Sequence, residues 1–135
     1  MYKGQLPSFV AVVDDEDDLV QLYKDALSQI RGIKVFAFTD SNLALEHFNI
    51  NHDNYFLVIS DFRMSGMNGI ELLDLIRKTD PRVKRFLISA FEVEDFLVQN
   101  CGCVDKFLQK PIKITELIRE VQMYSAIGEI MYPKI

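Results

Sequence analysis

Apolar residues along this chain gather in five short runs, separated by longer segments of mixed polarity. The runs predict β-strands over residues 9–13, 33–38, 55–60, 83–89 and 104–108. The run from Tyr55 to Ile59 shows no alternation of polar and apolar residues, which is typical of a parallel strand covered on both faces. The pattern therefore places the middle of a sheet at this run.

The segments between the runs carry apolar residues three and four positions apart, which is the spacing of an amphipathic helix. They predict helices over about residues 19–30, 41–48, 69–79, 92–100 and 114–126, with a polar loop at 49–54. Asp40 or Ser41 is suited to cap the second helix, and Asn68 with Glu71 has the spacing of a capping pair for the third.

Strands that alternate with helices predict an α/β fold, here a doubly wound five-stranded parallel sheet with five helices on its two faces. A chain of 135 residues is long enough to bury a core without disulfides or metals. No repeat or linker divides it. We therefore expect one domain over 1–135, with a core at about 8–126 and a short C-terminal tail at 127–135.

Composition and charge narrow the functional classes only a little. The net charge of −5 argues against a general nucleic-acid or membrane surface, because both favour a basic face. Cys101 and Cys103 are interpreted as free thiols, since they are too close in the chain for a useful structural crosslink. No run is long enough to span a membrane and the first residues lack a signal-peptide core, so a cytoplasmic location is expected.

Acidic, hydroxyl and amino side chains follow the predicted strands at the ends where parallel strands meet. Asp14 and Asp15 follow the first strand, Asp61 the third, Ser89 ends the fourth and Lys110 follows the fifth. Two carboxylates about 5 Å apart repel by roughly 3 kcal/mol at an effective dielectric constant near 20. Three together call for a cation, and a set of oxygen ligands favours Mg²⁺ or Mn²⁺.

These side chains fit phosphoryl transfer to a carboxylate. Asp61 would act as the nucleophile, Lys110 and the metal would neutralise the phosphoryl oxygens, and Ser89 would hydrogen-bond one of them. Each residue also has an ordinary structural explanation. An acidic run suits a helix start, and a single Asp after a strand is commonly a turn residue. Only their joint placement on one edge of the sheet favours the chemical interpretation.

Four motifs occur in a familiar order: VVDDE at 12–16, SDFRMSGMNG at 60–69, LISA at 87–90 and DKFLQKP at 105–111. With them the chain, from about residue 8 to 126, resembles the receiver domain of two-component response regulators, of the single-domain chemotaxis type. The resemblance implies a flavodoxin-like sheet with strand order 2-1-3-4-5. It also implies a phosphorelay switch, a phosphoprotein carrying an aspartyl phosphate.

The resemblance also implies residue roles. Asp61 would be the phosphoacceptor, and Lys110 the lysine that contacts the phosphate, with a cis bond into the next proline. The metal would be held by Asp14, Asp15, Asp61 and the backbone carbonyl of Arg63. Ser89 and Phe107 would form the switch, in which the aromatic ring moves inward as the hydroxyl follows the phosphate. Glu16, near the metal, and Phe91, beside the path of the attacking water, would modulate the site.

The sequence departs from the family pattern at four places. Ser65 stands where proline is usual, which would loosen the loop after Asp61. Cys103 stands where glycine is usual, the segment 89–103 is about one residue short, and Phe107 lacks the hydroxyl of the commoner tyrosine. The last three lie on the face built from helix 4, strand 5 and helix 5, through which the protein is expected to signal.

The resemblance implies a sensor histidine kinase or phosphotransfer protein as phosphoryl donor and an unidentified effector protein as target, without nucleic-acid contact or membrane insertion. The chain would be a monomer or a phosphorylation-dependent dimer, and not an enzyme beyond self-phosphorylation and slow self-dephosphorylation. The alternatives are a pseudo-receiver that binds without phosphorylation, an aspartyl-phosphate phosphohydrolase and a flavin-binding electron carrier. Arg63 occupies the general-acid position of the second, and the acidic loop at 14–18 would repel the phosphate of the third. His47 and His52 are interpreted as surface residues, since no ligand partner is apparent in the sequence.

Overall fold

The computed structural model describes residues 6–90 and 102–131. Its centre is a five-stranded sheet with the order β2-β1-β3-β4-β5, in which every neighbouring pair is parallel. The strands are β1 (Phe9–Val13), β2 (Lys34–Phe38), β3 (Tyr55–Asp61), β4 (Lys84–Ser89) and β5 (Lys106–Gln109). The predicted strand order and the predicted parallel sheet are therefore confirmed.

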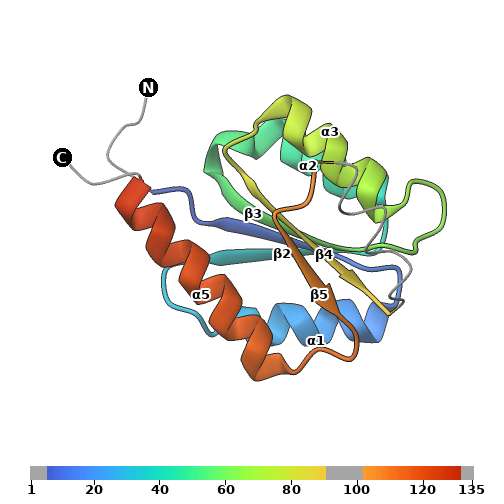
Figure 1. Ribbon diagram of the computed structural model, residues 1–135, viewed down its shortest axis with the longest axis horizontal. Helices are drawn as coiled ribbons and strands as arrows, with labels where there is room; N and C mark the ends of the chain where they lie inside the picture. The colour runs from blue at the N-terminus through green and yellow to red at the C-terminus, as the bar shows by residue number, and fades with distance from the viewer. Residues whose placement is uncertain (1–5, 91–101, 132–135) are drawn as a thin grey trace.

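Helices lie on both faces of this sheet (Figure 1). The described helices are α1 (Asp17–Leu27), α2 (Ser41–Asn51), the short 3-10 helix η1 (His52–Asn54), α3 (Gly69–Thr79) and α5 (Ile114–Met131). Helices α1 and α5 cover one face, and α2 and α3 the other (Figure 1). The helix predicted at 92–100 lies outside the described residues.

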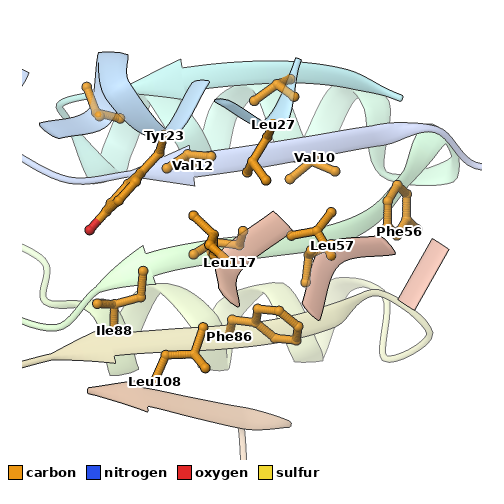
Figure 2. Packing of buried hydrophobic residues seen from close by; sticks show 14 residues of the cluster. Val10, Val12, Tyr23, Leu27, Phe56, Leu57, Phe86, Ile88, Leu108 and Leu117 are labelled. Atoms are coloured by element: carbon orange, nitrogen blue, oxygen red, sulfur yellow. The ribbon is translucent and has the colours of Figure 1, made fainter. Parts of the chain in front are cut away.

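The two faces of the sheet bury two separate apolar cores, because successive residues of a strand point to opposite sides. Val10 and Val12 of β1 pack with Tyr23 and Leu27 of α1 and with Leu117 of α5. Figure 2 shows this core, with the side chains of α1 and α5 lying against those of the central strands. The second core forms between the opposite face of β1 and the apolar sides of α2 and α3. A sheet buried on both faces explains the uninterrupted apolar run of β3.

Local signals placed several helix ends correctly. Asp40 caps α2 by accepting a hydrogen bond from the backbone N–H of Asn42 at 2.8 Å. Asn68 and Glu71 form a reciprocal capping box at the start of α3, as their spacing predicts. The bond between Lys110 and Pro111 is cis, as the resemblance implied.

Several predicted boundaries were wrong. Helix α1, predicted over about residues 19–30, covers Asp17–Leu27. The segment 49–54 is not a loop, because α2 continues to Asn51, whose side chain donates to the carbonyl of His47 at 2.9 Å, and η1 follows. Helix α5 continues to Met131 instead of ending before a tail. The one glycine inside α5 does not end the helix, because an interior glycine costs a helix only about 1 kcal/mol. Strand β5 begins at Lys106, two residues later than predicted.

A buried arginine explains the late start of β5. Arg85 of β4 donates from Nε to the carbonyl of Cys103 at 2.9 Å, and its backbone N–H donates to the carboxylate of Asp105 at 2.8 Å. Its guanidinium also lies 3.3 Å from that carboxylate. These contacts use the N–H of Arg85 and the carbonyl of Cys103, so the backbone bonds to β4 begin with the N–H of Asp105, which donates to the carbonyl of Arg85 at 2.8 Å.

The prediction that His47 and His52 are surface residues was also wrong, because both are half-buried. His47 is half-buried among the rings of Phe36, Phe38 and Tyr55, and its Nδ1 lies 2.8 Å from the Tyr55 hydroxyl. His52 lies 3.0 Å from the buried carboxylate of Asp80, which Arg82 also contacts. Helix η1 and the end of α3 bring these groups together at positions far apart in the sequence.

Among the described residues, no helix is both long enough and apolar enough to cross a membrane.

Candidate functional site

The acidic and basic side chains singled out in the sequence meet at the carboxyl ends of the strands. Asp61 is the last residue of β3, Ser89 the last of β4, and Asp14 and Lys110 directly follow β1 and β5. In open parallel sheets this edge is where ligands bind. The topology therefore places these four residues at one location.

Backbone hydrogen bonds extend the sheet into this location and fix the residues there. The N–H of Asp14 donates to the carbonyl of Phe38 at 3.1 Å, so β1 and β2 stay paired beyond the last strand residue. The N–H of Lys110 donates to the carbonyl of Ser89 at 2.8 Å in the same way. The side chains thus project from ordered backbone instead of from free loops.

Three carboxylates and one ammonium group form the centre of the site. Lys110 Nζ lies 3.0 Å from Asp61 Oδ1 and 3.5 Å from Asp14 Oδ2. One oxygen from each of Asp14, Asp15 and Asp61 lies within 4.8 Å of the others. Asp14 and Asp61 are buried, whereas Asp15 is exposed to solvent.

Burial makes the charges of this site costly. The pKa of Asp61 is raised to about 6, chiefly by burial; the hydrogen bond with Lys110 opposes the rise, and the neighbouring Asp14 carboxylate adds to it. The pKa of Asp14 is also raised by burial, against a hydrogen bond that its carboxylate accepts from the N–H of Glu16. Burial alone would lower the pKa of Lys110, but its contacts with Asp61 and Asp14 hold that pKa above the ordinary value.

The donor set of the site fits a hard divalent cation. Three carboxylates face a single ammonium group, and two unit charges 4.8 Å apart repel by about 3 kcal/mol at an effective dielectric constant near 20. Oxygen ligands with one side open to solvent, here at Asp15, suit Mg²⁺ or Mn²⁺, which commonly keep water in their shell. Asp14, Asp15 and Asp61 are therefore the side chains that could hold such an ion.

The other predicted residues lie around this centre. Ser89 is buried at the end of β4, and Phe107 of β5 is half-buried beside its strand partner Leu87. Arg63 and Glu16 are exposed, on the loop after β3 and before α1 respectively. Phe91, predicted to modulate the site, lies outside the described residues.

Sequence reasoning missed Tyr23, which is buried on α1 within reach of the charges of this site. Burial raises the pKa of its phenol, and the charges of Lys110, Asp14 and Asp61 all act on it. Its ring belongs to the first apolar core, and in Figure 2 its oxygen points away from the other labelled side chains. A tyrosine at an apolar position of an amphipathic helix was the available signal, but its spacing alone indicated only core packing.

Sequence reasoning also missed the requirement for glycine at position 69. Gly69 is the first residue of α3, and its N–H donates to the carbonyl of Phe62 at 2.9 Å. A Cβ at this position would overlap the backbone oxygen of Asp61. The close approach of α3 to the end of β3 therefore depends on the missing side chain.

Comparison with known proteins agrees with this geometry. The model of the response regulator receiver domain family matches residues 10–122, and the chain belongs to this family. Receiver domains of this kind are signalling modules of two-component systems.

Individual relatives span very different lengths. The chain is 25% identical over 114 residues to the nisin biosynthesis regulatory protein NisR of Lactococcus lactis. This match covers 84% of this chain and 48% of that protein. It is 29% identical over 115 residues to the regulatory protein AtoC of Escherichia coli. That match covers 84% of this chain and 24% of the relative. The chain thus matches less than half the length of either relative.

Solved receiver domains match over nearly their whole length. The receiver domain of the Francisella response regulator 1452 is 30% identical, with a TM-score of 0.74, over 89% of this chain and 98% of that one. A receiver domain protein from Clostridium thermocellum has a TM-score of 0.81 at 22% identity, over 92% and 98% of the two chains. The second likeness concerns the fold alone.

Proposed function

We propose that this chain is a phosphorylation-dependent switch in a two-component phosphorelay, with Asp61 as the phosphoacceptor. The contact that carries the proposal is the 3.0 Å approach of Lys110 Nζ to Asp61 Oδ1, beside two further carboxylates. Charges of both signs on one sheet edge suit a phosphoryl group, whose transfer depends on positioning and electrostatics more than on covalent chemistry.

Phosphoryl transfer would proceed by attack of an Asp61 carboxylate oxygen on the phosphorus of a phosphohistidine. The new P–O bond forms as the P–N bond breaks, and the departing imidazole takes up a proton. With a pKa of about 6, Asp61 is mainly ionised at neutral pH and so available as a nucleophile. Hydrolysis of the acyl phosphate by water would return the carboxylate and release inorganic phosphate, which resets the switch.

Other side chains would hold the phosphoryl group. Lys110 would move from the Asp61 carboxylate to a phosphoryl oxygen, and the Ser89 hydroxyl would donate to another. Asp14, Asp15, Asp61 and the Arg63 carbonyl would hold Mg²⁺ or Mn²⁺, which would supply positive charge to the reaction. Glu16 and Phe91 would modulate the reaction from the edge of the site.

The output surface in this proposal consists of β5, α5 and the helix that the sequence predicts at residues 92–100. Phe107 of β5 is half-buried and offers only its ring, so a change in its position would act sterically. On the same surface Lys106 contacts Glu120 of α5 at 3.2 Å. The donor would be a histidine kinase or phosphotransfer protein, and the target an effector protein.

The proposal predicts one phosphate per chain after incubation with acetyl phosphate and Mg²⁺, measured by intact mass. Asp61→Asn should abolish the adduct completely, and chelation of the metal should reduce it to background. Asp74→Asn is a matched control, because Asp74 is also a paired aspartate, in contact with Arg77 and Lys78 on α3. It should leave phosphorylation unchanged.

An adduct that persists in Asp61→Asn would disprove Asp61 as the acceptor. If wild type forms no adduct, binding of beryllofluoride separates two cases. Binding without phosphorylation would favour a pseudo-receiver that works through its surface, whereas absence of both would reject the site.

A further inference from the structure

The loop between Asp61 and α3, residues 62–68, is tied down at three points. At its start, the N–H of Phe62 donates to the carbonyl of Ile88 in β4 at 2.9 Å. At its base, the N–H of Gly69 donates back to the carbonyl of Phe62 at 2.9 Å. The third contact comes from another helix, where the Ser41 hydroxyl donates to the carbonyl of Met67 at 2.9 Å.

Ser41 is the first residue of α2 and is 2% exposed. Its Oγ also lies 3.7 Å from Met64 Sδ, so it contacts both the middle and the end of the loop. Met64 and Met67 are half-buried against the second apolar core, which orients the loop toward α2. The Ser41 side chain is therefore buried against the loop, whose Arg63, Ser65 and Gly66 are exposed.

The ordinary role of a serine at this position would be to cap α2, but another residue does so. Asp40 is the cap, and its carboxylate accepts from the N–H of Asn42 at 2.8 Å. Ser41 instead directs its hydroxyl to the loop. A buried side chain that bonds a loop backbone holds that backbone in one conformation, because loss of the donor would leave the carbonyl of Met67 without this partner.

We propose that Ser41 is a positioning residue that fixes loop 62–68, and with it the carbonyl of Arg63, for divalent-cation binding beside Asp61. The inference rests on the proposed function, which assigns that carbonyl to the metal. The bond from Gly69 fixes Phe62, on one side of Arg63. The contacts from Ser41 hold Met64 and Met67, on its other side. The carbonyl of Arg63 is therefore positioned by both. Loss of a residue that orients a metal ligand typically lowers the metal affinity by about 10- to 100-fold.

The test is the affinity of wild type and Ser41→Ala for Mg²⁺, measured by isothermal titration calorimetry without any phosphoryl donor. Ser41→Ala should bind Mg²⁺ roughly tenfold more weakly. Ser65→Pro, which restricts the loop backbone by another means, should restore part of that affinity in the double variant. Thr79→Ala is the matched control. It removes a hydroxyl that donates to the carbonyl of Leu75 at 3.1 Å at the far end of α3, and should bind Mg²⁺ as wild type does.

Thermal unfolding of the metal-free proteins separates positioning from general stability. A merely structural serine would lower the melting temperature and leave the Mg²⁺ affinity unchanged, and that result would overturn the inference. If Ser41→Ala does not fold, Ser41→Cys keeps the volume with a much weaker donor, and the same tenfold loss is expected. If wild type binds no Mg²⁺, the inference fails together with the metal site of the proposed function. Equal binding by wild type and Ser41→Ala rejects the inference alone.

Discussion

Gly69→Ala is expected to destabilise the protein by about 3 kcal/mol or more, the upper end of the usual cost of overpacking. Its Cβ would overlap the backbone oxygen of Asp61 and lie 2.8 Å from Leu87 Cδ1. The leucine could rotate, but the backbone oxygen belongs to a central strand and can move only together with that strand. Helix α3 would have to shift, which displaces the end of β3 and the acceptor side chain with it.

Urea unfolding and phosphorylation by acetyl phosphate measure this effect. Gly32→Ala is the matched control, because Gly32 has a φ of 86° and nothing lies within 4 Å of its added Cβ. That variant should lose only about 1 to 2 kcal/mol, the cost of a left-handed backbone for alanine, and should accept phosphate normally. Equal destabilisation of the two variants would contradict the proposed contact between α3 and β3.

Asp61→Asn is expected to stabilise the metal-free protein at pH 7.5 by about 2 to 3 kcal/mol. Burial raises the pKa of Asp61 from 3.8 to about 6, so the folded protein carries an unfavourable charge at this pH. Asparagine has the same shape without the charge, and Lys110 keeps its contact with Asp14. The same change should therefore remove phosphorylation and increase stability.

The sign of the pH dependence follows from the raised pKa. Above pH 6 Asp61 is ionised in both the folded and the unfolded protein, and the folded state bears the full cost. Between pH 6 and 3.8 the folded state takes up a proton first, so wild type gains stability relative to Asp61→Asn as the pH falls. Below pH 3.8 both states are protonated and the difference should vanish.

Melting temperatures of the two proteins from pH 4 to pH 8, without divalent metal, measure this difference. Added Mg²⁺ at pH 7.5 should raise the melting temperature of wild type more than that of Asp61→Asn, because binding to the folded state stabilises it by mass action. If Asp61→Asn is less stable than wild type at pH 7.5, the Asp61 carboxylate stabilises the fold. That result would contradict the interpretation that its buried charge destabilises the fold and is kept for function.

Sequence patterns predicted the secondary structure best where it depends on residues that are close together in the sequence. The apolar run of β3 and the capping box at Asn68 and Glu71 follow from spacing and side-chain chemistry alone, and both are present. Boundaries that depend on distant contacts were not predictable. Arg85 delays β5 through the carbonyl of Cys103, and no local pattern places a buried arginine against that segment.

The amino-acid sequence by itself determined the five strands, their parallel order through the motifs, and the identity of the charged residues at the strand ends. These features are set by short-range periodicity and by topology, which the alternation of strands and helices largely fixes. Only the tertiary structure decided that Lys110 lies 3.0 Å from Asp61, that Gly69 permits α3 to approach β3, and that Ser41 holds the loop between them. Those facts depend on which side chains meet across elements, and packing decides this.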